Sequence, residues 1–179
     1  MDWSKAKTIL IIALLIVCLI LGGILLQRDL VSRRQDKDAL LLCMEYLEDS
    51  GVLLQTEIPL ERPKLPVLFV KRVLEQQENS EEVIFDGYPL ETSVGQSASY
   101  SITGHGKSRA KVVSASSAVL KAVSEMGAFR IGAEIEKVEL IYYVDVIMYG
   151  DISSGTDTAV PAWKIQSSAG DFYISAYAQ

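Results

Sequence analysis

Histidine and cysteine are nearly absent from this sequence, which removes the usual ligands of metal sites and the usual bases of catalytic triads. There is one histidine, His105, and there are two cysteines, Cys18 and Cys43. A metal site built on paired histidines is excluded, and a Ser-His-acid triad would depend on His105 alone. Because His105 lies between two glycines, residues 104–107 are interpreted as a solvated loop. We therefore expect no catalytic residue, no metal site and no cofactor.

The two cysteines are too far apart in the expected structure to form a disulfide with each other. On one continuous helix Cys18 and Cys43 would lie about 37 Å apart. Cys43 is interpreted as a small apolar residue on a helix face, and an intermolecular disulfide through it stays open. The fold must then be stabilised by its hydrophobic core.

The charge balance is acidic, with 17 basic against 23 acidic residues. Such a balance argues against binding to nucleic acid or to anionic lipid. It is typical of a solvated domain whose partner is another protein. We expect no small-molecule substrate.

A long aliphatic run, from Thr8 to Leu26, carries no charged side chain. A helix of this length spans about 28 Å, close to the hydrocarbon thickness of a bilayer. The run predicts a transmembrane signal anchor over residues 8–26, after a cytoplasmic tail of residues 1–7. A cleaved signal peptide is disfavoured because residues 21–24 form a weak cleavage site.

The orientation of the predicted anchor is argued from its flanks. Positive charges are slightly more numerous after the run than before it, which by itself favours the opposite orientation. However, a seven-residue basic tail is a poor candidate for export. We expect an N-terminus in the cytoplasm, a stalk over residues 27–38 and an extracytoplasmic domain at the cell membrane.

The first half of this domain, residues 39–89, is predicted to contain one helix and three strands. The helix begins near Ala39 with an apolar stripe and ends at Ser50 and Gly51. Three prolines mark an extended segment that we expect not to be a central strand, because proline lacks an amide donor. A turn over residues 86–89 is the expected boundary between the halves. The expected strands are residues 52–58, 67–74 and 82–85.

The second half, residues 90–179, repeats the order of one helix and several strands. A helix begins after Ser114 and ends at Gly127. The clearest strand is 134–149, whose even positions from Val138 to Met148 are all apolar. The fold class is α+β, with an antiparallel sheet and packed helices, and a duplication of the halves stays open. The other expected segments are strand 97–103, loop 150–157 and the hairpin strands 159–166 and 172–178.

Two segments carry a resemblance to a known family. The opening Asp2-Trp3-Ser4-Lys5, with Lys7-Thr8-Ile9 and the aliphatic run, resembles the start of YycI-type regulatory proteins, which are bitopic proteins of Gram-positive bacteria. The ending, Val160 to Ile165 and Gly170 to Ala176, resembles the last strands of YycI and of PepSY-like domains, with Ser175 where those have Asn or Asp. The resemblance implies contact with a WalK-like sensor histidine kinase of cell-wall homeostasis and with a YycH-like companion.

The expected function is therefore that of a membrane-anchored, non-enzymatic regulator of a two-component sensor kinase. A pilin-like subunit of a cell-envelope or secretion assembly and an exported inhibitor of a cell-wall hydrolase are the alternatives. Candidate partner contacts are Cys18 and Gly22, which form a small-xxx-small helix face, and the aromatic residues Trp163 and Tyr173. Core packing is the competing interpretation of the two aromatic residues.

Overall fold

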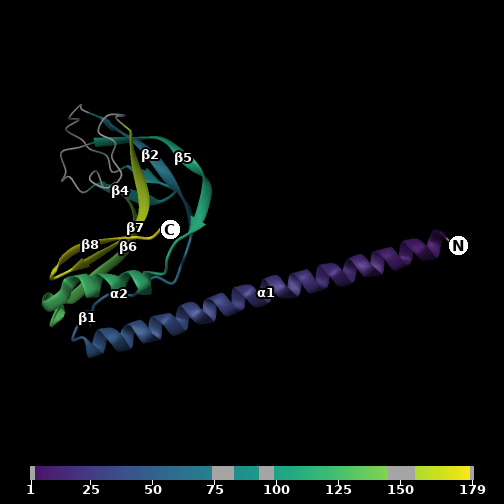
Figure 1. Ribbon diagram of the computed structural model, residues 1–179, viewed down its shortest axis with the longest axis horizontal. Coiled ribbons are helices and arrows are strands. Elements are labelled where there is room, and N and C mark those ends of the chain that lie inside the picture. Colours follow the sequence, from purple (N-terminus) through teal and green to yellow (C-terminus); the bar gives the residue numbers. More distant parts are fainter. Residues whose placement is uncertain (1–2, 74–82, 93–98, 145–155, 178–179) are drawn as a thin grey trace. The chain divides into compact units, whose positions relative to one another are not determined.

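The computed structural model describes residues 3–73, 83–92, 99–144 and 156–177. Contacts between residues divide the chain into two units, Met1–Ala39 and Leu40–Gln179. The first unit is helical, and the second combines a curled sheet with helices (Figure 1).

A single helix, α1 (Trp3–Asp49), forms the first unit and continues into the second. Among the described residues, we find no helix that is both long enough and apolar enough to cross a membrane. This finding contradicts the transmembrane helix predicted over residues 8–26. In the structure the apolar run is not an element of its own, because no glycine or proline interrupts the helix between residue 27 and Asp49.

Helix α1 ends where the sequence predicts. Gly51 has a left-handed φ of 72°, and the amide of Val52 donates to the carbonyl of Leu47 at 2.9 Å, as in a glycine-capped helix end. Cys43 and Leu47 are buried as expected, whereas Met44 is exposed. Cys43, in the buried stripe of α1, contacts helix α2 (Ala115–Met126). Its thiol donates to the Ser116 carbonyl at 3.6 Å.

The described residues contain eight strands in one mixed sheet. Six follow the order β3-β4-β6-β7-β2-β5, while β1 pairs with β6 and β8 with β7. The pairs β1–β6 and β4–β6 are parallel, so the prediction of a purely antiparallel sheet is wrong. The strands are β1 (Leu53–Leu54), β2 (Lys64–Val73), β3 (Ile84–Phe85), β4 (Tyr88–Thr92), β5 (Ser99–Lys111), β6 (Glu134–Val144), β7 (Thr156–Ser167) and β8 (Gly170–Ser175).

The sheet curls until side chains of its two end strands meet. The centroid of the Phe85 ring, at the end of β3, lies 6.0 Å from the centroid of the His105 ring of β5. Next to it, the Asp86 carboxylate lies 3.5 Å from the Arg109 guanidinium. Asp86 and Gly87 have positive φ angles of 54° and 88°, so the turn between β3 and β4 is a tight hairpin of the kind that Asp-Gly favours. The predicted turn is therefore confirmed at its first two residues.

Two local predictions fail because bulges accommodate unusual residues in strands. The predicted loop 104–107 lies inside β5, where register shifts let Gly104 and Gly106 remain in the strand. Pro66 lies inside β2, which the sequence predicts to begin only at residue 67. At Pro66 the strand pairs with β5 alone, beside a bulge, and this is a position where proline is tolerated.

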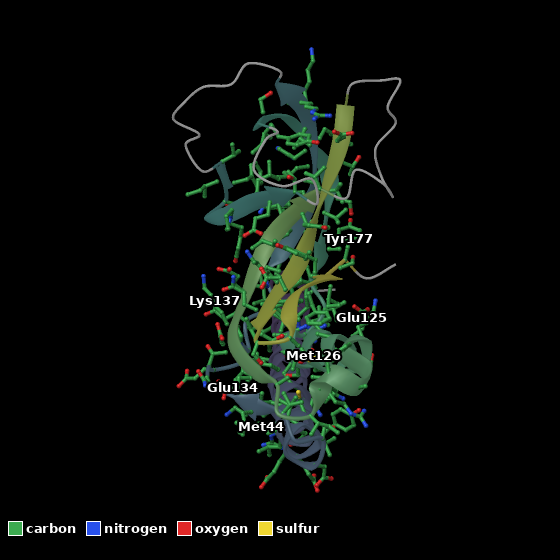
Figure 2. All side chains as sticks on the ribbon, turned by 90° about the vertical axis from the view of Figure 1, so that its left-hand side faces the viewer. Met44, Glu125, Met126, Glu134, Lys137 and Tyr177 are labelled. Carbon is green, nitrogen blue, oxygen red and sulfur yellow. The ribbon has the colours of Figure 1, made fainter. Side chains whose placement is uncertain are left out.

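Helix α2 covers one face of the sheet. The Ser114 hydroxyl caps it by accepting from the Ser117 amide at 3.3 Å, and its predicted apolar stripe is buried. Figure 1 shows α2 beside β6 and β8. In Figure 2, Met126 of α2 and Lys137 of β6 are labelled on opposite sides of the sheet. The even side chains of β6 from Val138 to Val144 are buried, as the alternation predicts.

The two predicted halves share this one sheet, because β2 of residues 39–89 lies between β5 and β7 of residues 90–179. The hairpin of β7 and β8 is confirmed, with a short turn at Ser168 and Ala169. The predicted continuation of β6 beyond Val144 and most of loop 150–157 lie outside the described residues. The predicted strand 52–58 is reduced to Leu53–Leu54.

Candidate partner-binding site

The face of the sheet opposite α2 carries a cluster of polar side chains that hydrogen-bond to one another. Alternation along a strand places odd residues of β6 and β8 and even residues of β7 on this face. The register sets Glu91 beside Tyr143 and sets Lys164 beside Tyr173. Four different strands thus each bring one side chain to the same surface. We call Glu91, Tyr143, Lys164 and Tyr173 the tyrosine platform.

An ion pair between Glu91 of β4 and Lys164 of β7 connects two strands of the platform. The Lys164 ammonium lies 2.8 Å from each carboxylate oxygen of Glu91. The Tyr173 hydroxyl donates to the same carboxylate at 3.1 Å. The side chain of Lys164 is only 12% exposed and that of Glu91 30% exposed. Because the pair is partly removed from water and has two charge-assisted hydrogen bonds, it fixes the geometry more firmly than a surface ion pair.

The two tyrosine rings of the platform stack on each other. Their centroids are 4.4 Å apart, with an angle of 17° between the ring planes. The partner of Tyr143 on β7 is Val160, and the partner of Tyr173 is Lys164. On β7, Ala162 lies midway between these two partners. The small side chain of Ala162 lets rings from β6 and β8 meet above it. The rings are partly exposed, while Ile141, Val160 and Ala162 on the same face are buried.

The surroundings of Tyr173 keep its hydroxyl protonated. Burial raises the pKa of Tyr173 above its usual value of 10.0, and the nearby charge of Glu91 and the hydrogen bond to it raise the pKa further. The carboxylate of Asp171, whose oxygen lies 3.9 Å from the Lys164 ammonium, acts in the same direction. At neutral pH the tyrosine is a hydrogen-bond donor, and the platform presents a fixed aromatic surface beside a paired lysine.

The platform combines an ion pair with two partly exposed aromatic rings. The Lys164 ammonium forms ion pairs with two carboxylates, that of Glu91 at 2.8 Å and that of Asp171 at 3.9 Å. Within the described ranges, no group of three or more His, Cys, Asp and Glu side chains is arranged to hold a metal ion. Partly exposed tyrosine rings on a rigid base are, in contrast, the residue type that dominates contact energies between proteins.

The structure separates the two aromatic residues that the sequence singles out. Trp163 is 1% exposed, and its indole N–H donates to the Val113 carbonyl at 2.9 Å. It belongs to the core, so its side chain cannot contact a partner in this structure. Tyr173 lies in the platform. Cys18 is exposed on α1, and a Cβ at Gly22 would meet nothing within 4 Å; contact of a partner helix with this pair stays a prediction.

Sequence reasoning missed Glu91, Tyr143 and Lys164 as site residues. One signal was available, since Lys164 is the single charge in the apolar run from Ala159 to Ile165. A lysine there needs a partner if the strand is buried. The partner, Glu91, is 73 residues away in the sequence. The parallel pairing of β4 with β6 brings it close, and local sequence patterns do not predict that pairing.

Comparisons of the chain with protein-family models, with curated proteins and with solved structures give no match.

Proposed function

We propose that the domain of residues 40–179 is a non-enzymatic regulatory module that binds a partner protein through the tyrosine platform. The stacked pair of Tyr143 and Tyr173, held in place by the Glu91–Lys164 ion pair, is the observation that carries this proposal. Aromatic side chains that are rigid before binding lose little conformational entropy when they are covered. The resemblance of the chain ends to YycI-type proteins supplies the partner, a WalK-like sensor histidine kinase.

Regulation follows if the platform contacts one state of the kinase better than the other. A bound protein shifts an equilibrium only by the difference in its affinity for the two states. Each 1.4 kcal/mol of such a difference changes the ratio of active to inactive kinase about tenfold. The direction of the shift is set by which kinase state presents a surface complementary to the two rings.

The test is isothermal titration of the full chain with the full-length sensor kinase in detergent micelles. Tyr173→Ala removes one ring of the stack and should weaken binding about tenfold or more, as expected for an aromatic contact residue. Tyr173→Phe keeps the ring but loses the hydrogen bond to Glu91, so it should bind nearly as well as the wild type. The matched control is Tyr46→Ala, which removes a tyrosine that is 40% exposed on α1. Equal affinity of wild type and Tyr173→Ala would refute the proposal.

A further inference from the structure

Strands β2 and β8 lie one after the other along the same edge of β7. Strand β6 pairs with β7 from Ala159 to Ser167, so it occupies one edge of β7 over that length. Strand β2 pairs with β7 up to Ala159, and β8 pairs with it from Ala162 onward. Because β6 fills one edge, β2 and β8 share the other. Their side chains therefore form one column beside β7.

Strand β2 brings a charged and an aromatic side chain to the face that carries the tyrosine platform. In the register Lys71 is opposite Thr156, and Phe69 is opposite Thr158. Even residues of β7 point to the platform's face, so Lys71 and Phe69 do as well. Lys71 is exposed, and Phe69 is 45% exposed. On β5 the partner of Phe69 is Gly104, which has no side chain to cover the ring.

Strand β8 brings the same two kinds of side chain to this face in the reverse order. Tyr173 is opposite Lys164, and Asp171 is opposite Gln166. The side chain of Asp171 is 44% exposed, and its charge is opposite to that of Lys71. Along β7 the order is therefore charge, ring, ring, charge. We call the four residues Lys71, Phe69, Tyr173 and Asp171 the side column.

The side column is symmetric about Pro161 of β7. On β7, the partners of Phe69 and Tyr173 are each three residues from Pro161, and those of Lys71 and Asp171 are each five residues from it. At 3.3 Å per residue, the positions of the two rings are about 20 Å apart along β7. Two rings and two opposite charges, each pair centred on the same residue, make a surface that is complementary to itself under a two-fold rotation.

We propose that a second copy of this chain packs face to face on the side column, about a two-fold axis that crosses β7 at Pro161. The rotation places Phe69 of one copy over Tyr173 of the other. It likewise places Lys71 over Asp171, so each contact forms twice. Facing sheets of β-sandwiches pack through the side chains of their inner surfaces in the same way.

The centre of this contact is apolar. On β6, Tyr143 is opposite Val160 and Ile141 is opposite Ala162, so the positions of Tyr143 and Ile141 are also equally far from the axis. Tyr143 of one copy therefore lies over Ile141 of the other. An apolar centre with charges at its ends is the usual anatomy of a protein interface.

The dimer covers the tyrosine platform, because Tyr143 and Tyr173 belong to both surfaces. A copy within the dimer cannot present these rings to a kinase, so self-association and kinase binding exclude each other. The inference does not rest on the proposed function, since the register and the charges of this chain alone carry it.

The test is sedimentation equilibrium of the full chain in a density-matched detergent, which measures the Kd of the dimer. Lys71→Glu brings two acids together in each charged contact, and Asp171→Lys brings two bases together. Because like charges repel, each variant alone should raise the Kd about tenfold or more. An equimolar mixture of the two variants pairs opposite charges in both contacts again, as does a variant that carries both substitutions. Both should associate with the Kd of the wild type.

The aromatic contact and the controls are measured in the same way. Phe69→Thr removes the ring that packs on Tyr173 and should raise the Kd about tenfold or more. The controls are Leu60→Thr, at a residue 43% exposed, and Lys121→Glu, at an exposed residue of α2. They should leave the Kd unchanged. Equal urea midpoints of all variants separate loss of the contact from loss of folding.

Three results would overturn the inference. They are a chain that stays monomeric at every concentration, a dimer whose Kd is the same in Lys71→Glu, Asp171→Lys and Phe69→Thr, and a mixture of the two charge variants that associates no better than either alone. The second result would place the contact outside the side column, for example on α1. If the chain is monomeric and Tyr173→Ala still weakens kinase binding, the inference fails while the proposed function stands.

Discussion

Replacing Trp163 by alanine should unfold much of the domain of residues 40–179, because the side chain is a core residue. Trp163 is 1% exposed and lies on β7 between its register partners Leu140 and Ile174. Truncation of a buried tryptophan to alanine costs about 3 to 5 kcal/mol. The Val113 carbonyl also loses the indole donor at 2.9 Å, which adds about 0.5 to 1.5 kcal/mol.

The expected total is about 4 to 6 kcal/mol, from a domain stability of roughly 5 to 15 kcal/mol. With a urea dependence of about 2 kcal/mol per molar, the unfolding midpoint should fall by roughly 2 to 3 M. Pulse proteolysis of the full chain at increasing urea concentrations measures this midpoint without relying on tryptophan fluorescence. Trp163→Phe keeps most of the apolar volume but no N–H donor, so it should lose less than half as much.

A midpoint for Trp163→Ala within 0.5 M of the wild type, on the order of 1 kcal/mol, would refute this reasoning. It would mean that the indole contributes little to the core. If the same variant also lost kinase binding, Trp163 would have to be moved from the core to the contact surface. The Trp163→Phe control separates the loss of packing from the loss of the hydrogen bond to Val113.

Two further predictions follow from the buried polar groups. Burial raises the pKa of Cys43 from 9.0 to about 11 and that of Tyr142 from 10.0 to about 12. Because the folded state holds these protons more tightly than the unfolded state, the free energy of unfolding should be constant below pH 9 and fall as the pH rises to 12. Cys43→Ala should flatten the part of the curve of urea midpoint against pH that lies between pH 9 and 11. Lys164→Met should lower the free energy of unfolding in urea by about 1 to 3 kcal/mol because Glu91 loses its ion pair. The control Lys137→Met, which breaks a more exposed pair with Glu139, should lower it by under about 1 kcal/mol. Similar losses in the two variants would contradict the special role of Lys164.

The sequence was sufficient wherever structure is set by neighbours along the chain. The cap at Ser114, the buried stripe of α2 and the end of α1 at Gly51 each depend on contacts within one or two helical turns. The alternation of β6 likewise identified its buried face. These features require no knowledge of which strands pair.

The sequence was insufficient wherever structure depends on distant pairing. The parallel pairing of β4 with β6 puts Glu91 beside Tyr143, and no local pattern predicts that register. Gly104 and Gly106 are typical of a loop, but pairing with β2 keeps them in a strand. Helix α1 differs from the prediction for another reason: the aliphatic run predicts an isolated transmembrane element, whereas the structure continues the helix to Asp49 and no described helix is apolar enough to cross a membrane.

Site-specific photo-crosslinking tests the central claim most directly, because it reports contact and not stability. Tyr173→benzoylphenylalanine places a photoreactive ring in the tyrosine platform, and Tyr46→benzoylphenylalanine places one on α1 as a control. Each full-length variant is irradiated with the sensor kinase, and the products are separated by mass. We predict a crosslinked complex from position 173 and none from position 46. A crosslink from position 46 alone, or none from either position under conditions where the two proteins bind, would contradict the account.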